Sequence, residues 1–255
     1  MEYIKNIVVI GTGNVGHHLV HGLFDTKIKI KGIWSRTSQN AKTIAQSLNC
    51  PVISSIESIN SSVADLVLIS VVDDAIETIL SQLDVDIPVA YTSGSVRLDQ
   101  LPKRKKIGVF YPLQTFSKKR SIDLSDIPFL IEASDPSFAE ELFGLAQKLS
   151  SNVSYADSND RYQLHIAAVM VNNFTNHLFS LAKEHLDKNH IDFELLKPLL
   201  KETVYKLDEL NPSEAQTGPA KRGDIEVIEK HLSSLAGRTK EIYRLLSDSI
   251  LEMYK

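Results

Sequence analysis

A glycine-rich turn near the N-terminus places the tightest constraint on how this chain can fold. The turn fits the pattern G-x-G-x-x-G and consists of Gly11, Thr12, Gly13, Asn14, Val15 and Gly16. It follows an apolar run at residues 7–10 and opens a stretch of helical character that reaches Phe24. A buried strand, such a turn and a helix in direct succession predict a βαβ unit that binds a dinucleotide.

Each glycine of this turn has an expected role. Gly11 permits a tight turn, Gly13 lets the backbone approach a pyrophosphate, and Gly16 allows the helix to pack closely on the strand. The free N–H groups and the positive dipole end of the helix then attract the phosphates.

The end of the next strand decides which dinucleotide is expected. An NAD site usually has an Asp or Glu about 20 residues after the turn, where it binds the ribose 2′-hydroxyl. This chain instead has Ser35, Arg36 and Thr37 after Trp34, with no carboxylate. Arg36 can clamp a 2′-phosphate and the two hydroxyls can donate to it. The alternative is that Arg36 is an ordinary surface arginine; we expect NADP(H).

The rest of the first half alternates β-rich and helical runs, and the second half is helical throughout. The pattern predicts an α/β, Rossmann-type doubly wound and mostly parallel sheet, followed by an all-α domain. We expect strands at residues 7–10, 27–34, 51–53, 65–71, 88–92, 106–110, 129–132 and 153–155. Helices are expected to Phe24 and at 38–48, 74–82, 138–149, 159–188, 193–210, 225–235 and 239–254. The change from alternating β-rich and helical runs to helical runs alone predicts two domains. They are an NADP-binding domain at 1–156 and a helical substrate and dimerisation domain at 157–255.

Ligands of such sheets lie outside the carboxyl ends of the strands. The segment Ser70-Val71-Val72-Asp73-Asp74 closes the strand at 65–71. Val71 is expected to line the cofactor there, and Asp73 or Asp74 is expected to cap the next helix. Ser93, in the small polar turn Thr92-Ser93-Gly94-Ser95, is either a cofactor contact or a turn-forming residue. The segment Tyr111-Pro112-Leu113-Gln114-Thr115-Phe116 follows the next strand, and Gln114 and Thr115 can reach the cleft.

These segments, together with residues 165–174 and 217–224, resemble a known family over essentially the whole chain. It is the bacterial family of Rossmann-like proteins with a helical C-terminal domain of unknown function. Its broader relatives are the pyrroline-5-carboxylate reductases, β-hydroxyacid dehydrogenases, ketopantoate reductases and deazaflavin-dependent NADP reductases. The resemblance implies hydride transfer to or from a small substrate and a homodimer formed through the helical domain. Some members of the closer family are thought to be ketopantoate reductases, which makes a small keto acid the expected substrate.

The chain departs from these relatives at one catalytic position. The hydroxyacid branches have a lysine four residues before an asparagine on the first long C-terminal helix. Here Val169 precedes Asn173 by four residues and Ala168 precedes Asn172. That lysine mechanism therefore cannot be transferred to this chain.

The same helix offers other catalytic candidates. His165 and Asn172 are seven residues apart, close to one face of an α-helix, and Asn173 is adjacent. A histidine can protonate a carbonyl oxygen as hydride arrives, and an amide can orient the substrate. These side chains are equally compatible with a helix interface. Arg222 follows a Gly-Pro turn and can bind a substrate carboxylate, while Asp224 either caps the next helix or holds Arg222.

The remaining features exclude several classes of protein. The net charge is −4 with a pI near 6.1, which predicts no general affinity for nucleic acid or membrane surfaces. Cys50 is the single cysteine, so no internal disulfide is expected and a reducing cytoplasm fits. No apolar run approaches the roughly 18 residues of a membrane span, and no cluster has metal-ligand spacing. The sequence leaves two alternatives to a keto-acid reductase: an NADP(H) sensor without turnover, and a cyclic imine reductase.

Overall fold

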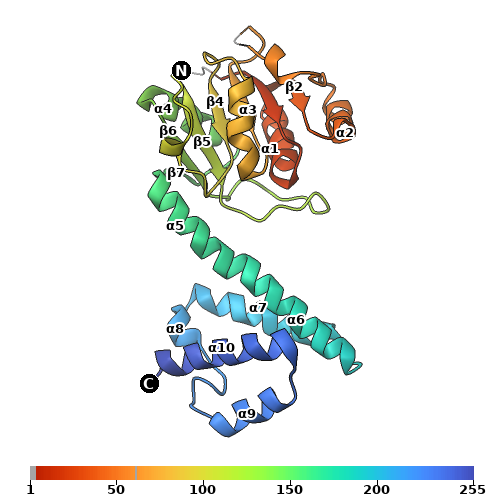
Figure 1. The fold of residues 1–255 in the computed structure, drawn as a ribbon, viewed down its shortest axis with the longest axis vertical. Helices are drawn as coiled ribbons and strands as arrows, with labels where there is room; N and C mark the ends of the chain where they lie inside the picture. The colour runs from red at the N-terminus through yellow and green to blue at the C-terminus, as the bar shows by residue number, and fades with distance from the viewer. Residues whose placement is uncertain (1–3, 61) are drawn as a thin grey trace. The chain divides into compact units, whose positions relative to one another are not determined.

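The computed structural model describes residues 4–60 and 62–255, which form two compact units, Met1–Asn173 and Phe174–Lys255 (Figure 1). The sheet lies in the first unit. The sequence predicts that the mixed α/β pattern gives way to helices near residue 157. In the structure β7 ends at Tyr155 and α5 begins at Ser158. The first unit extends further, because α5 packs with the sheet-containing part.

Seven strands form one sheet within the described residues, in the order β2-β1-β3-β4-β5-β6-β7. Neighbouring strands are parallel except β5 and β6, which are antiparallel. The strands are β1 Asn6–Ile10, β2 Lys29–Trp34, β3 Leu66–Ile69, β4 Val89–Tyr91, β5 Ile107–Pro112, β6 Phe129–Ala133 and β7 Val153–Tyr155. The predicted fold class is confirmed: a mostly parallel Rossmann-type sheet followed by helices.

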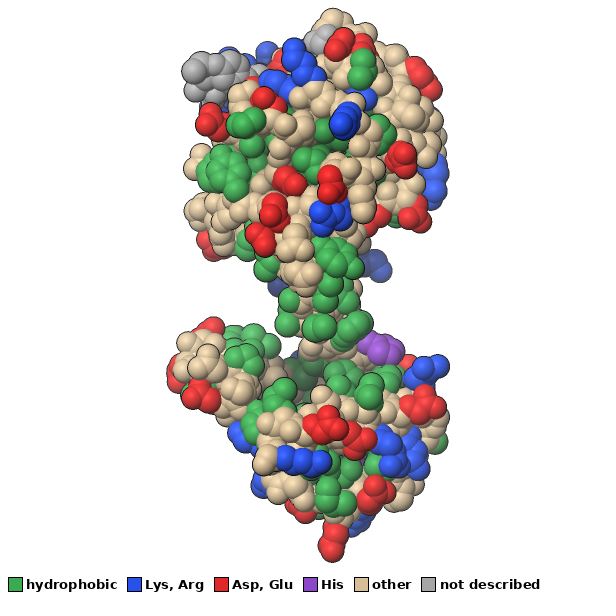
Figure 2. Space-filling view, turned by 60° about the vertical axis from the view of Figure 1, so that its left-hand side comes forward, with side chains coloured by type: hydrophobic (Ala, Val, Ile, Leu, Met, Phe, Trp, Pro, Cys, Tyr) green, Lys and Arg blue, Asp and Glu red, His purple; other side chains and the backbone are tan. Residues whose placement is uncertain are grey.

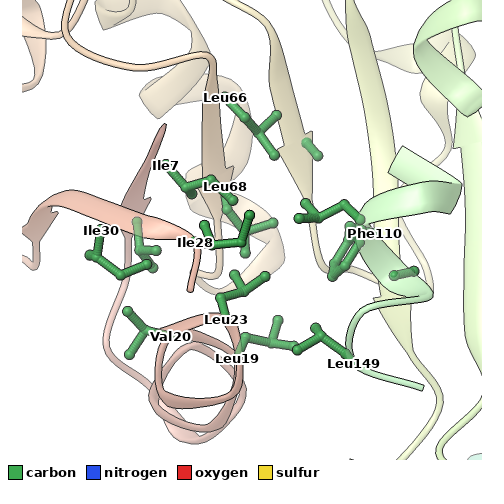
Figure 3. Packing of buried hydrophobic residues seen from close by; sticks show 14 of the residues in the cluster. Ile7, Leu19, Val20, Leu23, Ile28, Ile30, Leu66, Leu68, Phe110 and Leu149 are labelled. Atoms are coloured by element: carbon green, nitrogen blue, oxygen red, sulfur yellow. The ribbon is translucent and has the colours of Figure 1, made fainter. Parts of the chain in front are cut away.

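Helices cover both faces of this sheet, and the side chains of β1 point alternately into the hydrophobic cores on these two faces. Ile7 and Val9 pack with α1 (Asn14–Asp25), α2 (Ser38–Leu48) and α4 (Pro136–Ala146), as Figure 3 shows in part. Val8 and Ile10 pack with α3 (Ile76–Gln82) on the other face. Side chains of a strand point alternately to opposite faces, so an apolar run with no polar positions requires cover on both. The glycine turn that follows β1 is therefore held in place by a strand that is buried on both faces.

Two predicted elements differ in detail. The expected strand at 51–53 reduces to a single bridge between Ile33 and Val52, because Pro51 has no N–H with which to extend a ladder. The helix expected at 74–82 begins as a short 3₁₀ turn, Asp73–Ala75, before α3. The link from β5 to β6, residues 113–128, is long for a compact domain, and links of this length commonly have a function.

Residues 158–188 are helical throughout, as predicted, but not uniformly α-helical. They comprise α5 Ser158–Ala168, a π-helical segment Val169–Phe174 and α6 Thr175–Lys188. Asp157 caps α5 by accepting the N–H groups of Asn159 and Asp160, each at 2.8 Å. π-Helical turns are rare and occur frequently at functional sites.

The second unit is helical and has a small core. Its further α-helices are α7 Lys197–Tyr205, α8 Pro212–Ala215, α9 Ile225–Ser233 and α10 Gly237–Met253. Ala220, Ile228 and Leu232 form the buried cluster. Neither α6 nor α7 contains a buried residue. No helix in the described part of the chain is both long and apolar enough to cross a membrane.

Candidate active site

A cavity of about 1080 Å³ lies where β1 to β5 end. Its volume is at the upper end for small-molecule sites. Its walls bring together most of the side chains that the sequence selects for the cofactor and for catalysis. Those residues are Gly11, Thr12, Gly13, Asn14, Val15, Ser35, Arg36, Thr37, Val71, Ser93 and His165.

The glycine turn has the geometry of a phosphate cradle. Gly11 has φ +102°, and a Cβ there would lie 2.1 Å from the Ser70 carbonyl oxygen. Gly16 lies behind the cavity wall, where a Cβ would lie 2.3 Å from the Gly11 carbonyl oxygen. A Cβ on Gly13 would meet no atom within 4 Å, so open space faces this residue. The turn is thus closely packed on the protein side and open where a phosphate would approach.

Two helix N-termini beside the cavity are available to anions. The N-cap residues are Gly13 for α1 and Thr37 for α2, and neither helix has a side-chain cap or an acidic residue in its first turn. The first N–H groups of each helix can therefore donate to a phosphate. The Thr12 hydroxyl donates to Ser35 Oγ at 2.9 Å and ties the glycine turn to the end of β2. Arg36 is adjacent to this link.

The turn after β4 is held by its own serines. Ser93 Oγ accepts the N–H groups of Ser95 at 3.2 Å and Val96 at 3.0 Å, so this side chain forms the turn. Ser95 Oγ donates to the Asp73 carboxylate. The expectation that Asp73 or Asp74 caps the next helix is wrong: neither the 3₁₀ turn nor α3 has a side-chain cap. Asp73 instead holds the neighbouring turn, and both aspartates line the cavity.

A tyrosine–histidine pair lies over this turn. Tyr111 Oη and His165 Nδ1 are 3.1 Å apart, and both residues line the cavity. Gly94 makes room for them, because a Cβ there would lie 2.6 Å from Tyr111 Cζ and 2.8 Å from His165 Nδ1. Burial raises the pKa of Tyr111, an effect that the Arg161 charge opposes and the Asp73 charge adds to. The phenol therefore keeps its proton at neutral pH.

A buried arginine fixes the helix that carries His165. Arg161 lies one turn earlier on α5, forms an ion pair with Glu132 of β6, and donates to the Val96 carbonyl at 2.6 Å. Its side chain is 1% exposed. Ser158 Oγ donates to the same carboxylate, 2.9 Å from each oxygen. This network connects α5, β6 and the turn after β4.

The structure does not bring every predicted site residue to the cavity. Asn172 and Asn173 lie on the π-helical segment and are exposed, and neither is among the lining residues. A π-helix has wider turns than an α-helix, so the seven-residue spacing no longer sets Asn172 on the face of His165. Arg222 belongs to the second unit, where it pairs with Asp224 at 3.6 Å. Asp224 makes no side-chain cap, so of its two expected roles the ion pair is the one observed.

The cavity also contains residues that the sequence did not single out, among them Tyr111 and Lys118. Tyr111 lies in the segment after the strand at 106–110, and Lys118 lies in the long link before β6. The position of Tyr111 at the carboxyl end of a central strand was the available signal. Lys118 has no comparable signal. Of the expected contacts in the 111–116 segment, Gln114 lines the cavity and Thr115 is not among its lining residues.

Among residues 4–60 and 62–255, no group of three or more His, Cys, Asp and Glu side chains could hold a metal ion. The chemistry available to the described cavity is that of phosphate-binding N–H groups, hydroxyls and proton-transfer side chains. Fold and cavity together define a class: a dinucleotide-binding protein that has a protonated phenol and an imidazole beside its cofactor space.

Comparisons with known proteins narrow this class. Residues 6–90 match the family described as "NADP oxidoreductase coenzyme F420-dependent", and residues 127–250 match "Domain of unknown function (DUF2520)". A solved structure from Bacteroides fragilis, described as "putative NADP oxidoreductase", is 38% identical with a TM-score of 0.88. That likeness covers 99% of this chain and 100% of the other. The chain belongs to this family of NADP oxidoreductases with a DUF2520 C-terminal domain, and the family resemblance read from the sequence is confirmed.

More distant structures share the fold. An imine reductase from Myxococcus stipitatus in complex with NADP⁺ is 14% identical with a TM-score of 0.67, covering 98% of this chain and 92% of that one. A 1-pyrroline-5-carboxylate reductase from Streptococcus pyogenes is 14% identical with a TM-score of 0.66, covering 98% of each chain. No curated protein matches the sequence at a significant level. The family match and the 38% identical structure show that the protein is an NADP-dependent oxidoreductase, as predicted.

Proposed function

We propose that this enzyme uses NADPH to reduce a small keto acid, ketopantoate or a close analogue, in the cavity at the carboxyl ends of the strands. The observation that carries the proposal is the convergence in one cavity of the glycine turn, Arg36 and the Tyr111–His165 pair. NADPH, when bound, supplies the hydride. The protein supplies binding, orientation and the proton.

The residues around the cavity fit NADP(H) at both of its phosphate groups. The open face of Gly13 and the N-terminus of α1 suit a pyrophosphate. Ser35, Arg36 and Thr37 at the N-terminus of α2 suit a 2′-phosphate. No carboxylate occupies the position that would bind a free 2′-hydroxyl. Val71 and Ser93 line the space beyond these phosphate sites.

Protonation of the substrate is assigned to the His165 region. His165 is held by Tyr111 at the wall of the cavity, so a carbonyl oxygen bound there can receive a proton as hydride arrives. Asn172 and Asn173 remain proposed as amides that orient the substrate, and Arg222 as the ligand of its carboxylate. Those three roles are supported by the sequence pattern alone.

A cyclic imine is the second candidate substrate. Asp73 lines the cavity, and a carboxylate near the reacting atom stabilises the positive charge of a protonated imine. A keto acid does not benefit from such a charge. The carboxylate of Asp73 would therefore favour reduction of an imine and would not favour reduction of a keto acid.

The test is oxidation of NADPH against a panel of 2-keto acids, cyclic imines and coenzyme F420, with NADH in parallel. Turnover of a keto acid with clear NADPH preference supports the proposal, and turnover restricted to imines moves the assignment to the second candidate. Tight NADPH binding without turnover on any member would contradict both and favour a sensor. Asp73→Asn is a useful companion, because it should slow imine reduction and leave keto-acid reduction less affected.

We also propose that the helical domain forms a homodimer. Figure 2 shows green apolar surface on this unit. The large apolar side chains that this unit exposes include Leu195, Leu199, Val204, Tyr205, Leu207, Leu210, Leu245, Leu246 and Met253. On the last helix, α10, Ile250 and Leu251 pack against the small core, whereas Leu245 is 70% exposed. Exposed apolar side chains that gather into a patch mark interaction sites on proteins. Light scattering at micromolar concentration should give a dimer that Leu199→Glu disrupts; a monomeric wild-type protein would contradict this proposal.

Two further expectations stay proposals. The cytoplasm is the proposed location, on the ground that the single cysteine forms no internal disulfide. Residues 157–255 are the proposed substrate and dimerisation domain.

A further inference from the structure

We propose that Tyr111 hands the proton to the substrate and that His165 replenishes it, so that the two side chains act as one relay. This inference rests on the proposed function and assigns Tyr111, which the sequence did not select, a catalytic role. It also moves His165 from direct donor to second member of the relay.

The first support is position. Tyr111 lies at the carboxyl end of β5, a strand buried in the sheet, whereas His165 comes from α5. Ligands of a parallel sheet occupy the crevice outside these strand ends. The phenol lies on the rigid side of the cavity, where the reacting part of a cofactor and its substrate are expected. Groups held on strands maintain catalytic geometry better than groups on loops.

The second support is the contact between the two rings. Tyr111 Oη and His165 Nδ1 are 3.1 Å apart, within hydrogen-bond distance. A Cβ at residue 94 would lie 2.8 Å from Tyr111 Oη and 2.8 Å from His165 Nδ1. The pair therefore lies against the Gly94 backbone, and any other residue at that position would push the two rings away. Glycine is therefore required at residue 94 by the Tyr111–His165 pair as well as by the turn itself.

The third support is charge. Burial raises the pKa of Tyr111, so a free tyrosinate is unfavourable at this site. The charged groups that face the phenol are Arg161 from α5, which lowers this pKa, and Asp73 from the turn before α3, which raises it. Such a phenol donates a proton more readily when another group returns one in the same step. The imidazolium form of His165, with its Nδ1–H directed to Oη, is the neighbour that can do so.

The proposed step balances. Hydride from NADPH forms the new C–H bond, and the π-electron pair of the carbonyl moves onto its oxygen. That oxygen takes the proton of Tyr111 Oη, which takes the proton of His165 Nδ1, and neutral His165 regains a proton from solvent. For an imine the nitrogen replaces the oxygen as acceptor.

The test compares Tyr111→Phe with His165→Asn on the substrate found in the panel. Loss of a general acid costs about 10²–10⁴ in rate. The relay predicts that Tyr111→Phe lowers kcat by such a factor while the Kd for NADPH changes by less than about threefold. His165→Asn should lose less, because Tyr111 can still donate and be recharged by water. If His165 donates directly, the order reverses, and that result would overturn the relay.

Two readouts separate this proposal from a structural role. In mixtures of H₂O and D₂O, two protons in flight give a curved proton inventory for the wild-type enzyme and a straight one for His165→Asn. A straight wild-type inventory contradicts the relay. In the cofactor-free protein, Tyr111→Phe should change the ¹⁵N shift of His165 Nδ1, and an unchanged shift would show that the pair is not coupled. A wild-type enzyme that turns over no substrate rejects the proposed function, whereas an active enzyme with an active Tyr111→Phe variant rejects only the relay.

Discussion

Arg161 of α5 and Glu132 of β6 form a buried ion pair, and this pair connects the sheet to the helix that presents His165. Because Arg161 also donates to the Val96 carbonyl, the same side chain fixes the turn that lies beneath Tyr111 and His165. Neither residue is among those that line the cavity. Their effect on catalysis is therefore one of positioning.

Breaking this pair should destabilise the first unit strongly. Arg161→Met leaves the Glu132 carboxylate without its buried partner, a change that costs about 3–5 kcal/mol. The double variant Arg161→Met with Glu132→Leu should lose clearly less than the sum of the single variants. Urea denaturation measures these differences. Arg97→Met, which removes the exposed pair with Asp99, is the control and should leave the midpoint unchanged. Equal losses for both arginines would contradict the assignment.

Arg36 should decide between the two nicotinamide cofactors. Arg36→Ala removes charge-assisted hydrogen bonds to a 2′-phosphate, worth about 1.5–3 kcal/mol, and should weaken NADPH binding about 10- to 150-fold. NADH binding should change little. Quenching of tryptophan fluorescence gives both dissociation constants. Lys31→Ala is the matched control, because Lys31 is exposed on β2, the strand that ends just before Arg36, and does not line the cavity. A similar loss for NADH in Arg36→Ala would show that this side chain does not read the 2′-phosphate.

Alanine substitutions at two glycines of the turn should affect NADPH binding and the stability of the fold separately. Gly13→Ala places a methyl group in open space, so the fold should keep its thermal midpoint while NADPH binding weakens by more than about tenfold. Gly16→Ala drives a methyl group to within 2.3 Å of the Gly11 carbonyl oxygen and should cost about 1–3 kcal/mol of stability. Differential scanning fluorimetry with and without NADPH tests both. Unchanged NADPH affinity in Gly13→Ala would remove the pyrophosphate from this turn.

How far the sequence could predict this molecule depends on the range of the interactions. The elements of the first unit follow from local patterns: the run at Ile7 to Ile10 alternates between two cores, so both its strand and its cover were predictable. The cofactor turn was equally local, since Gly11 to Gly16 are contiguous. The ends of elements were less accurate, as the single bridge at Val52 shows.

The catalytic constellation was harder to predict because it is formed by contacts between distant segments. Tyr111 and His165 are 54 residues apart and meet only once α5 packs on the sheet. Asn172 was selected by α-helical spacing, and the π-helical segment changes that spacing. No sequence pattern predicts the π-helical segment. No sequence pattern predicts the hydrogen bond from Ser95 to Asp73 either.

Alkaline pH should destabilise the protein through its buried tyrosines. Burial raises the pKa of Tyr91, whose hydroxyl donates to the Val96 carbonyl at 3.1 Å, and also that of Tyr111. In the unfolded chain a phenol ionises near about pH 10, while these two stay protonated in the fold. Below that pH their contribution is fully present; above it the unfolded chain binds fewer protons, and stability falls as pH rises.

Urea denaturation at about pH 8, 10 and 11 tests this dependence. Tyr91→Phe should be slightly less stable than the wild type at the lowest pH, by about 1 kcal/mol for the lost hydrogen bond, and should lose less on going to the highest. Tyr162→Phe, at an exposed position outside the proposed dimer surface, is the control and should follow the wild-type curve. Parallel curves for wild type and Tyr91→Phe would show that this tyrosine ionises alike in both states.

The measurement that tests the whole account most directly is a crystal structure of the protein with NADP⁺ bound. The account predicts the pyrophosphate at Gly13 and the N-terminus of α1, the 2′-phosphate on Arg36, and the nicotinamide ring beside Tyr111, with C4 facing a space within reach of its hydroxyl. A nicotinamide ring bound away from Tyr111 and His165, or a 2′-phosphate without contact to Arg36, would contradict it.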